Sequence, residues 1–310
     1  MRKMLESCTA IITGGGRGIG LAIAKSLSEA GANVVISDTG VTIDGADPDS
    51  SVASMAASQV RGPAISFTES VSTPQGAKSL VESAIDSFGQ IDIIINNAAI
   101  LRDSFIFKGV PSDWDRVVAT NLSGPYYLLA AATPFLREQS KAKADYAFGR
   151  IVNITSTAGF YGNYGQTAYA SAKAGLFGLT RAVALDMARS RITCNAVAPF
   201  ASTRVTKTIQ PMNELQSEYK ERALRLSTSH VATLVTYLCG EKAQGVSGQL
   251  FAVRGREVFI FNQPRPKAKA VNIQKDWTAD TLALAVDEKL KPDFTPLETD
   301  LEAFNTEPVI

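Results

Sequence analysis

The stretch Ile11-Ile12-Thr13-Gly14-Gly15-Gly16-Arg17-Gly18-Ile19-Gly20 decides the fold of this 310-residue chain. Apolar residues precede its glycines, and the helical pattern of Leu21–Ala30 follows them and closes at Gly31. Glycines let a backbone turn sharply and approach a pyrophosphate, while a helix start offers free N–H groups and the positive end of its dipole. The stretch therefore predicts a dinucleotide-binding turn between a strand and a helix. Its expected contacts are Gly14, Gly16, Arg17, Gly18, Ile19 and Gly20.

Seven strand-like runs alternate with helix-like segments along the chain. Continuous apolar runs such as Ile91–Ile95 suit strands that are covered on both faces, as in a parallel sheet. The repeated order predicts an α/β fold, a Rossmann-type doubly wound seven-stranded parallel sheet. The expected strands are Thr9–Thr13, Asn33–Ser37, Ala64–Thr68, Ile91–Ile95, Arg150–Ile154, Ile192–Val197 and Gln249–Val253.

The composition changes near residue 255. Residues 1–255 are expected to form a single catalytic domain, whereas 256–310 begin with a Pro- and Lys-rich stretch and include a helix-like segment, Thr278–Leu290. We expect 256–310 to be a C-terminal extension that packs on the domain or on a partner subunit. The loop 200–228 is the expected substrate lid, because ligands bind at the carboxyl ends of the strands in such sheets.

Charge and composition exclude several classes of protein. Lys and Arg total 31 against 30 Asp and Glu, so no general attraction to nucleic acid or to anionic membranes follows. No apolar run reaches the ~18 to 20 residues of a membrane span, and the N-terminus lacks the pattern of a secretory signal. We expect a cytoplasmic protein. With one histidine, His230, and three scattered cysteines, we expect no metal site.

Asp38 ends the second expected strand and follows Gly18 by 20 residues. A carboxylate at that position accepts hydrogen bonds from the adenosine ribose and repels a 2′-phosphate, which favours NAD over NADP. Arg17 is the counter-argument, because a guanidinium inside the glycine turn can pair with a 2′-phosphate. NADP therefore stays open as the less favoured cofactor.

Further motifs follow in order: Asn96-Asn97-Ala98-Ala99, then Asn121, then Ser156, then Tyr169-x-x-x-Lys173. With the glycine turn, this series resembles the short-chain dehydrogenase/reductase family from about residue 7 to 255. The resemblance implies an NAD-dependent oxidoreductase that acts on CH–OH groups. Ala99 and Phe200 replace glycines that are usual in the family, and Glu69 replaces the commoner Asp.

The spacing of Tyr169 and Lys173 has a chemical reason. Residues four apart on a helix share a face, so the Lys173 ammonium is expected beside Tyr169, where it would lower a phenol pKa that starts near about 10. Tyr169 could then exchange a proton with a substrate oxygen near neutral pH.

The resemblance assigns further roles. It implies that Lys173 also holds the nicotinamide ribose, that Ser156 bonds the substrate oxygen, and that Asn121 anchors a water relay. It makes Tyr169 and Lys173 cofactor contacts as well as catalytic residues. It adds the cofactor contacts Glu69, Ser70, Asn96, Ala98, Pro199 and Thr203.

A narrower similarity comes from Asn96–Asp103, from Gly159–Gln166 and from the long tail. These segments resemble the (3R)-hydroxyacyl-CoA dehydrogenase domain of peroxisomal multifunctional enzymes, also called 17β-hydroxysteroid dehydrogenase type four. The similarity implies a (3R)-hydroxyacyl-CoA or a hydroxysteroid as the small-molecule substrate. The lid residues Val205, Ile209, Met212 and Leu215 favour a lipophilic substrate, although amphipathic packing of the lid would also explain them.

Two alternatives stay open. One is a dehydrogenase-like protein that senses NAD without turnover, against which the complete set Asn121, Ser156, Tyr169 and Lys173 argues. The other is a dehydrogenase of a small polar alcohol or sugar. By family analogy the segments 113–136 and 165–187 are expected to pair across a two-fold axis, giving a homodimer or homotetramer.

Overall fold

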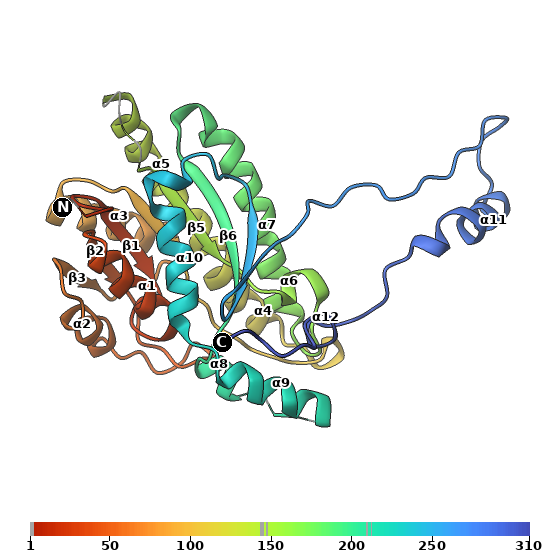
Figure 1. The fold of residues 1–310 in the computed structure, drawn as a ribbon, viewed down its shortest axis with the longest axis horizontal. Coiled ribbons are helices and arrows are strands. Elements are labelled where there is room, and N and C mark those ends of the chain that lie inside the picture. The colour runs from red at the N-terminus through yellow and green to blue at the C-terminus, as the bar shows by residue number, and fades with distance from the viewer. Residues whose placement is uncertain (1–2, 143–145, 147, 209, 212) are drawn as a thin grey trace.

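The computed structural model describes residues 3–142, 146, 148–208, 210–211 and 213–310. Its centre is an eight-stranded sheet in the order β3-β2-β1-β4-β5-β6-β7-β8 (Figure 1). Seven neighbouring strands run parallel, and β8 pairs with β7 antiparallel. The strands are β1 (Thr9–Thr13), β2 (Asn33–Ser37), β3 (Ala64–Phe67), β4 (Ile93–Asn96), β5 (Arg150–Ile154), β6 (Thr193–Phe200), β7 (Leu250–Arg254) and β8 (Glu257–Ile260).

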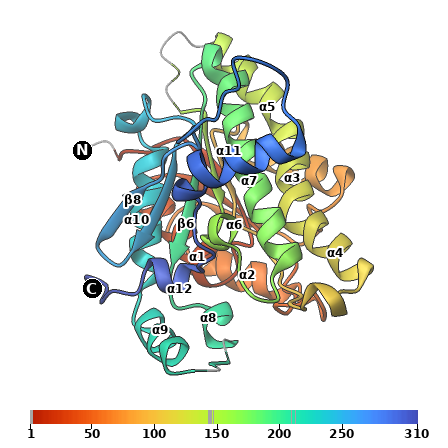
Figure 2. The ribbon, with the colours of Figure 1, turned by 90° about the vertical axis from the view of Figure 1, so that its right-hand side faces the viewer.

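Helices cover both faces of the sheet (Figures 1 and 2). Adjacent strand residues point to opposite faces, so Ile12 packs in the core beneath α1 and α10 while Ile11 packs in the core beneath α3 and α5. The helices are α1 (Gly18–Glu29), α2 (Ser51–Ser58), α3 (Pro74–Phe88), α4 (Pro111–Val118), α5 (Gly124–Ala142), α6 (Ala158–Tyr161), α7 (Thr167–Met187), α8 (Arg204–Thr208), α9 (Glu214–Leu224), α10 (Thr228–Cys239), α11 (Ala279–Lys289) and α12 (Asp300–Ala303). None of the described helices has the length and apolar character of a membrane span.

The predicted α/β fold and its seven parallel strands are confirmed. The main differences are that β4 starts at Ile93 and that β6 continues to Phe200. The eighth strand, β8, was missed. It is a half-exposed edge strand that follows a tight turn at Gly255, where φ is +59°. So short a strand next to a Pro- and Lys-rich stretch carries little periodicity to detect.

The expected boundary at residue 255 falls in the turn between β7 and β8. Beyond β8, residues 262–298 make a long excursion away from the sheet and carry α11 (Figure 1). The chain then returns, and the backbone N–H of Arg256 donates to the carbonyl of Val309 at 2.8 Å. The final segment therefore lies against the β7–β8 hairpin.

A buried carboxylate, Asp92, ties together the amino-terminal edge of the sheet. It is 2% exposed and accepts hydrogen bonds from the Thr9 backbone at 2.8 Å, from the Tyr146 hydroxyl at 2.9 Å, and from the side chains of Gln90 and Gln139. Its loss would leave several buried donors without an acceptor.

We expect Asp92→Ala to lower the free energy of unfolding by about 2–4 kcal/mol, measured by chemical denaturation. The matched control is Asp86→Ala, which removes an exposed carboxylate from α3 and should change stability by less than about 0.5 kcal/mol. Equal effects of the two substitutions would contradict the structural role of Asp92.

Candidate active site

A cleft of about 610 Å³ opens at the carboxyl ends of the parallel strands. The glycine turn borders it at one end, the ends of β4, β5 and β6 form its floor, and α8 and α9 cover it as the sequence predicts for a lid. Val205 of α8 lines the cleft. Ile209 and Met212, two of the apolar lid residues expected to favour lipophilic substrates, lie outside the described residues.

Two glycines of the turn, Gly14 and Gly20, have no room for a side chain. A Cβ on Gly20 would lie 2.1 Å from the Gly14 carbonyl oxygen, and one on Gly14, where φ is +62°, would lie 2.8 Å from the Cα of Ala98. Asn97 belongs to the Asn96–Ala99 motif but is not among the expected cofactor contacts. It holds this turn by donating to the carbonyls of Thr13 and Gly14 at 3.0 and 2.9 Å. The turn precedes the free N–H groups of α1, so the cradle fits a dinucleotide pyrophosphate.

Asp38 lies beside the glycine turn, as predicted. Its two carboxylate oxygens accept hydrogen bonds from the backbone N–H groups of Gly16 and Gly40, each at 2.8 Å. A Cβ on Gly16 would approach the Asp38 carboxylate to 2.7 Å. This arrangement fixes the carboxylate where an adenosine ribose is expected next to such a turn.

Two guanidinium groups lie at the same end of the cleft. Arg17 donates to the carbonyls of Gly40 and Val41 at 3.3 Å, and Arg204 of the lid donates to the Val41 carbonyl at 3.2 Å. Burial lowers the pKa of Arg204, and the nearby Arg17 charge lowers it further. Both positive charges thus lie near Asp38. A guanidinium is therefore in place to pair with the 2′-phosphate of NADP, as the sequence indicates for Arg17.

Most of the remaining predicted cofactor residues line the cleft. Asn96 is an exception. It is 3% exposed in β4, and its side-chain amide donates to the side-chain oxygen of Asn153 at 2.8 Å, so it braces two strands. Gly16 acts through its backbone contact with Asp38. The predicted residues that do line the cleft are Gly14, Arg17, Gly18, Ile19, Gly20, Asp38, Glu69, Ser70, Ala98, Pro199 and Thr203.

Three of the four predicted catalytic residues meet in the cleft. Helix α7 carries Tyr169 and Lys173 on one face, and Ser156 follows the end of β5. The Ser156 hydroxyl is close enough to Tyr169 to act against the rise of its pKa, and it accepts from the Ala158 backbone N–H at 3.2 Å. The Lys173 ammonium lies 5.6 Å from the centroid of the Tyr169 ring and donates to the Ile154 carbonyl at 2.8 Å. The site therefore brings two hydroxyl groups and a buried amino group together in one cleft.

Asn121 lies in a single π-helical turn, Ala119–Ser123, and is fully buried. Its side-chain oxygen accepts from the Ile100 backbone N–H and its amide donates to the Ile100 carbonyl, both at 2.9 Å. The residue therefore fixes the loop after β4 at the cleft floor. Its neighbour Thr120 lines the cleft, whereas Asn121 itself does not.

Burial dominates the ionisation of the catalytic pair. It raises the pKa of Tyr169 to about 12, against the lowering effect of the hydrogen bond with Ser156, and it lowers the pKa of Lys173 to about 8. The lowering of the Tyr169 pKa that the sequence predicts is therefore wrong for this arrangement of the protein. The physical reason is desolvation of the phenolate, which the nearby carboxylates of Asp103 and Asp300 reinforce.

Two acidic residues in the cleft, Asp103 and Asp300, are not among the site residues expected from the sequence. Asp103 accepts a hydrogen bond from the Gln166 side chain at 2.9 Å, and burial raises its pKa. Asp300 comes from the C-terminal segment and is 9% exposed. Among the described residues, no group of three or more His, Cys, Asp and Glu side chains is arranged to hold a metal ion.

The sequence profile of the short chain dehydrogenases matches residues 8–214. The chain belongs to this family. It is 38% identical, over 80% of its length and 82% of the relative, to a short-chain type dehydrogenase/reductase of Mycobacterium tuberculosis. A short chain dehydrogenase from Mycobacterium avium has a similar crystal structure, with a TM-score of 0.79, 31% identity, and coverage of 96% of this chain and 99% of that one.

Two further relatives carry more specific names. The peroxisomal hydratase-dehydrogenase-epimerase of Saccharomyces cerevisiae is 37% identical over 83% of this chain, which spans only 28% of that enzyme. The hydroxyacyl-CoA dehydrogenase ChsB1 of Mycobacterium tuberculosis is 33% identical over 84% of this chain and 81% of its own length. The narrower resemblance to the peroxisomal multifunctional enzymes is thereby confirmed as a resemblance. Members of the family bind NAD or NADP, so this is a nicotinamide-dependent oxidoreductase.

The buried Lys173 predicts a distinctive pH dependence of stability. Its folded-state pKa of about 8 lies below its ordinary value of 10.5. Between these values the unfolded chain holds a proton that the folded chain has released, so the lysine's contribution to stability rises with pH. Wild type should gain about 2–3 kcal/mol over Lys173→Met between pH 7 and 10, measured by chemical denaturation.

The matched control is Lys78→Met, which removes a lysine that is 64% exposed on α3. It should follow the wild-type pH dependence. A constant stability difference between wild type and Lys173→Met across this range would show that the ammonium is not desolvated.

Proposed function

We propose that this protein is a cytoplasmic NAD(H)-dependent dehydrogenase that interconverts a secondary alcohol and a ketone, on a lipophilic substrate such as a hydroxysteroid or a 3-hydroxyacyl-CoA. The observation that carries the proposal is the meeting of Ser156, Tyr169 and Lys173 beside the glycine cradle in one cleft. Neither the cradle nor the hydroxyl pair alone would distinguish an alcohol dehydrogenase from another nucleotide-binding protein.

The residues divide the proton chemistry among them. Ser156 and Tyr169 hold the substrate oxygen through their hydroxyls, and Tyr169 takes the proton of the alcohol in oxidation and returns it in reduction. Burial disfavours the Tyr169 phenolate. The Lys173 ammonium, 5.6 Å from the centroid of the ring, is the charge that offsets part of this cost when the phenolate forms during proton transfer. The nicotinamide, when bound, accepts or supplies the hydride.

NAD is the proposed cofactor because Asp38 is held at the ribose end by two backbone hydrogen bonds. An adenosine 2′-phosphate would meet that carboxylate directly, and like charges at such a distance discriminate strongly. The guanidiniums of Arg17 and Arg204 would attract a 2′-phosphate. The preference for NAD⁺ over NADP⁺ therefore depends on whether the repulsion by Asp38 exceeds this attraction.

The proposed substrate class rests on two observations. A relative over most of this chain is named a hydroxyacyl-CoA dehydrogenase, and Phe200 and Val205 present apolar surface to the cleft. The cleft also contains Asn163, Gln166 and Gln216, which favours the second candidate, a dehydrogenase of a polar alcohol or sugar. A panel of alcohols of both kinds separates the two.

We expect the purified protein to reduce NAD⁺ with at least one member of a panel of hydroxysteroids, (3R)-hydroxyacyl-CoAs and polyols, followed at 340 nm. Tyr169→Phe should lower kcat by at least about 100-fold and leave NADH binding, measured by fluorescence titration, nearly unchanged. Tyr237→Phe, which alters a tyrosine that is 45% exposed on α10 and does not line the cleft, is the matched control and should retain activity.

The outcomes separate the three candidates. Turnover of steroids or acyl-CoAs supports the lipophilic class, and turnover confined to polyols supports the polar-alcohol class. Tight NADH binding with no turnover across the panel would instead support a protein that senses NAD without catalysis. Activity that survives in Tyr169→Phe would refute the proposed acid/base.

We expect Asp38→Ser to shift the cofactor preference from NAD⁺ toward NADP⁺. Loss of a charged acceptor should lower kcat/KM for NAD⁺ about 10-fold, and removal of the repulsion should raise kcat/KM for NADP⁺ by at least as much. Asp49→Ser changes an acidic residue in the same loop whose carboxylate bonds to Ser51, and it should leave both values unchanged. A wild type that prefers NADP⁺ would overturn the assignment.

We also propose that the protein is a homodimer or homotetramer through α5 and α7. These helices leave Tyr126 and Leu185 exposed by 55% and 73%, and a shallow apolar groove lies between the helices beside Leu179. Light scattering should give a multiple of the 33.0 kDa chain mass, and Leu185→Glu should shift it toward that mass. A wild-type monomer would refute the proposal.

A further inference from the structure

The C-terminal segment 299–309 forms part of the wall of the cleft. Arg254 of β7, which is 5% exposed, holds it by donating to the carbonyls of Phe304 and Thr306 at 2.9 and 3.1 Å and to the Thr306 hydroxyl at 2.8 Å. The ring of Phe304 packs against Phe200 with the centroids 4.8 Å apart. Phe200 ends β6 and lines the cleft. The segment is thus docked on β6 and β7.

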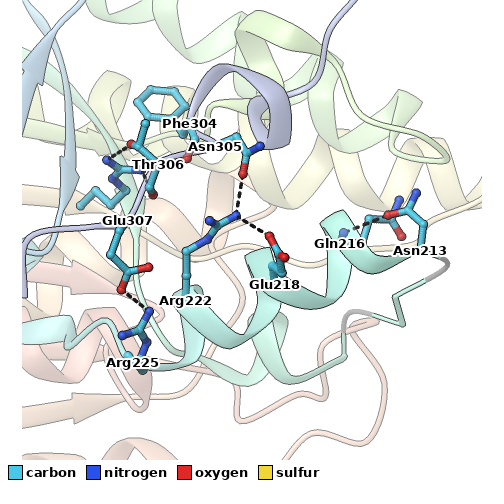
Figure 3. Close-up of polar contacts among 10 residues, drawn as sticks. Asn213, Gln216, Glu218, Arg222, Arg225, Phe304, Asn305, Thr306 and Glu307 are labelled. Carbon is cyan, nitrogen blue, oxygen red and sulfur yellow. Dashed lines mark hydrogen bonds and ion pairs between the residues drawn. The ribbon is translucent and has the colours of Figure 1, made fainter.

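The same segment is joined to the lid. Arg222 of α9 donates to the Asn305 side chain at 2.7 Å, and Arg225 forms an ion pair with Glu307 (Figure 3). Both contacts lie at the C-terminal end of α9, as Figure 3 shows. The lid helix and the final segment therefore close the substrate end of the cleft together.

This docking carries the Asp300 carboxylate to the catalytic residues. One of its oxygens accepts a hydrogen bond from the Thr157 hydroxyl at 2.6 Å, and Thr157 directly follows Ser156. Asp300 and Tyr169 line the same cleft, and the Asp300 charge is close enough to raise the pKa of Tyr169. Asp300 therefore faces the same cleft as the hydroxyl of Tyr169.

The surroundings of Asp300 leave room for a donor from outside the protein. Its carboxylate receives hydrogen bonds from Thr157 and from backbone N–H groups of its own turn, and no Lys or Arg among the described residues forms an ion pair with it. A carboxylate has about four acceptor positions. Burial also raises its pKa, so a further donor would stabilise the charged form.

We propose that Asp300 is a substrate-binding carboxylate that selects alcohols carrying a second hydrogen-bond donor, a hydroxyl or an amide N–H, near the reacting carbinol. The inference rests on the proposed alcohol dehydrogenase activity and narrows its substrate class. A pantetheine thioester offers an amide N–H beyond its sulfur, and a diol offers a hydroxyl. A purely structural role for Asp300, which is to anchor the segment through Thr157, makes a different prediction for the same measurements.

Two matched pairs of substrates test the proposal and distinguish the two kinds of donor. The first pair is the N-acetylcysteamine thioester of (3R)-3-hydroxybutyrate and its S-butyl thioester, which lacks the amide. The second pair is butane-1,3-diol and butan-2-ol. For at least one pair, wild type should show kcat/KM at least about 10-fold higher for the member with the donor.

In Asp300→Asn and Asp300→Ala that ratio should fall toward one, through loss of kcat/KM for the donor member alone. Asp280→Asn, which changes an exposed carboxylate on α11, is the matched control and should keep the wild-type ratio. If both members of a pair lose activity together in the Asp300 variants, Asp300 only anchors the segment and the proposal is overturned.

The measurements distinguish failure of the proposed role of Asp300 from failure of the proposed dehydrogenase activity. Equal kcat/KM for both members in wild type, with no effect of Asp300→Asn, overturns the role of Asp300 and leaves the proposed dehydrogenase intact. Absence of any turnover by wild type with either nucleotide overturns the dehydrogenase and the role of Asp300 with it.

Discussion

The close approach of Gly20 to the carbonyl of Gly14 is the constraint on which the rest of the site depends. At this separation no side chain fits between the start of α1 and the end of β1, so the helix axis points its free N–H groups into the cleft. Asn97 stabilises this close contact by donating its side-chain amide to the carbonyls of Thr13 and Gly14. Since Asn97 follows β4, the glycine turn is fixed relative to the central strands. The phosphate end of the cleft is thereby positioned relative to Ser156, which follows β5.

The catalytic end of the cleft obeys a different physical rule, the cost of burying charge. Tyr169 and Lys173 are placed side by side by one helix turn, and burial disfavours the charged form of each. Burying an ammonium costs stability when its main protein partner is a single neutral carbonyl, here that of Ile154. Stability of the fold alone therefore does not explain the position of Lys173. The arrangement is understandable when the ammonium has a second task, to stabilise a phenolate during proton transfer.

Local patterns explain what could be predicted from the sequence. The glycine turn, the buried strands and the Tyr169–Lys173 pair each depend on residues close together in the chain, where spacing determines geometry. Asp38 could be found because the length of a β-α-β unit is nearly constant. The ionisation of Tyr169 could not, since desolvation depends on everything packed around the phenol. Nor could Asp300, because its place in the cleft is determined by Arg254, Phe304 and Arg222, whose contacts with the last residues follow no sequence period.

The excursion 262–298 changes how the final segment should be regarded. Because so long a connection imposes little geometry on its ends, residues 299–309 resemble a peptide ligand tethered to its own receptor, present at a high effective concentration. Doubling the length of such a tether costs only about 0.6 kcal/mol in closure entropy. The free energy of docking therefore depends only weakly on the length of the excursion and mainly on the contacts that residues 299–309 make with β7 and α9.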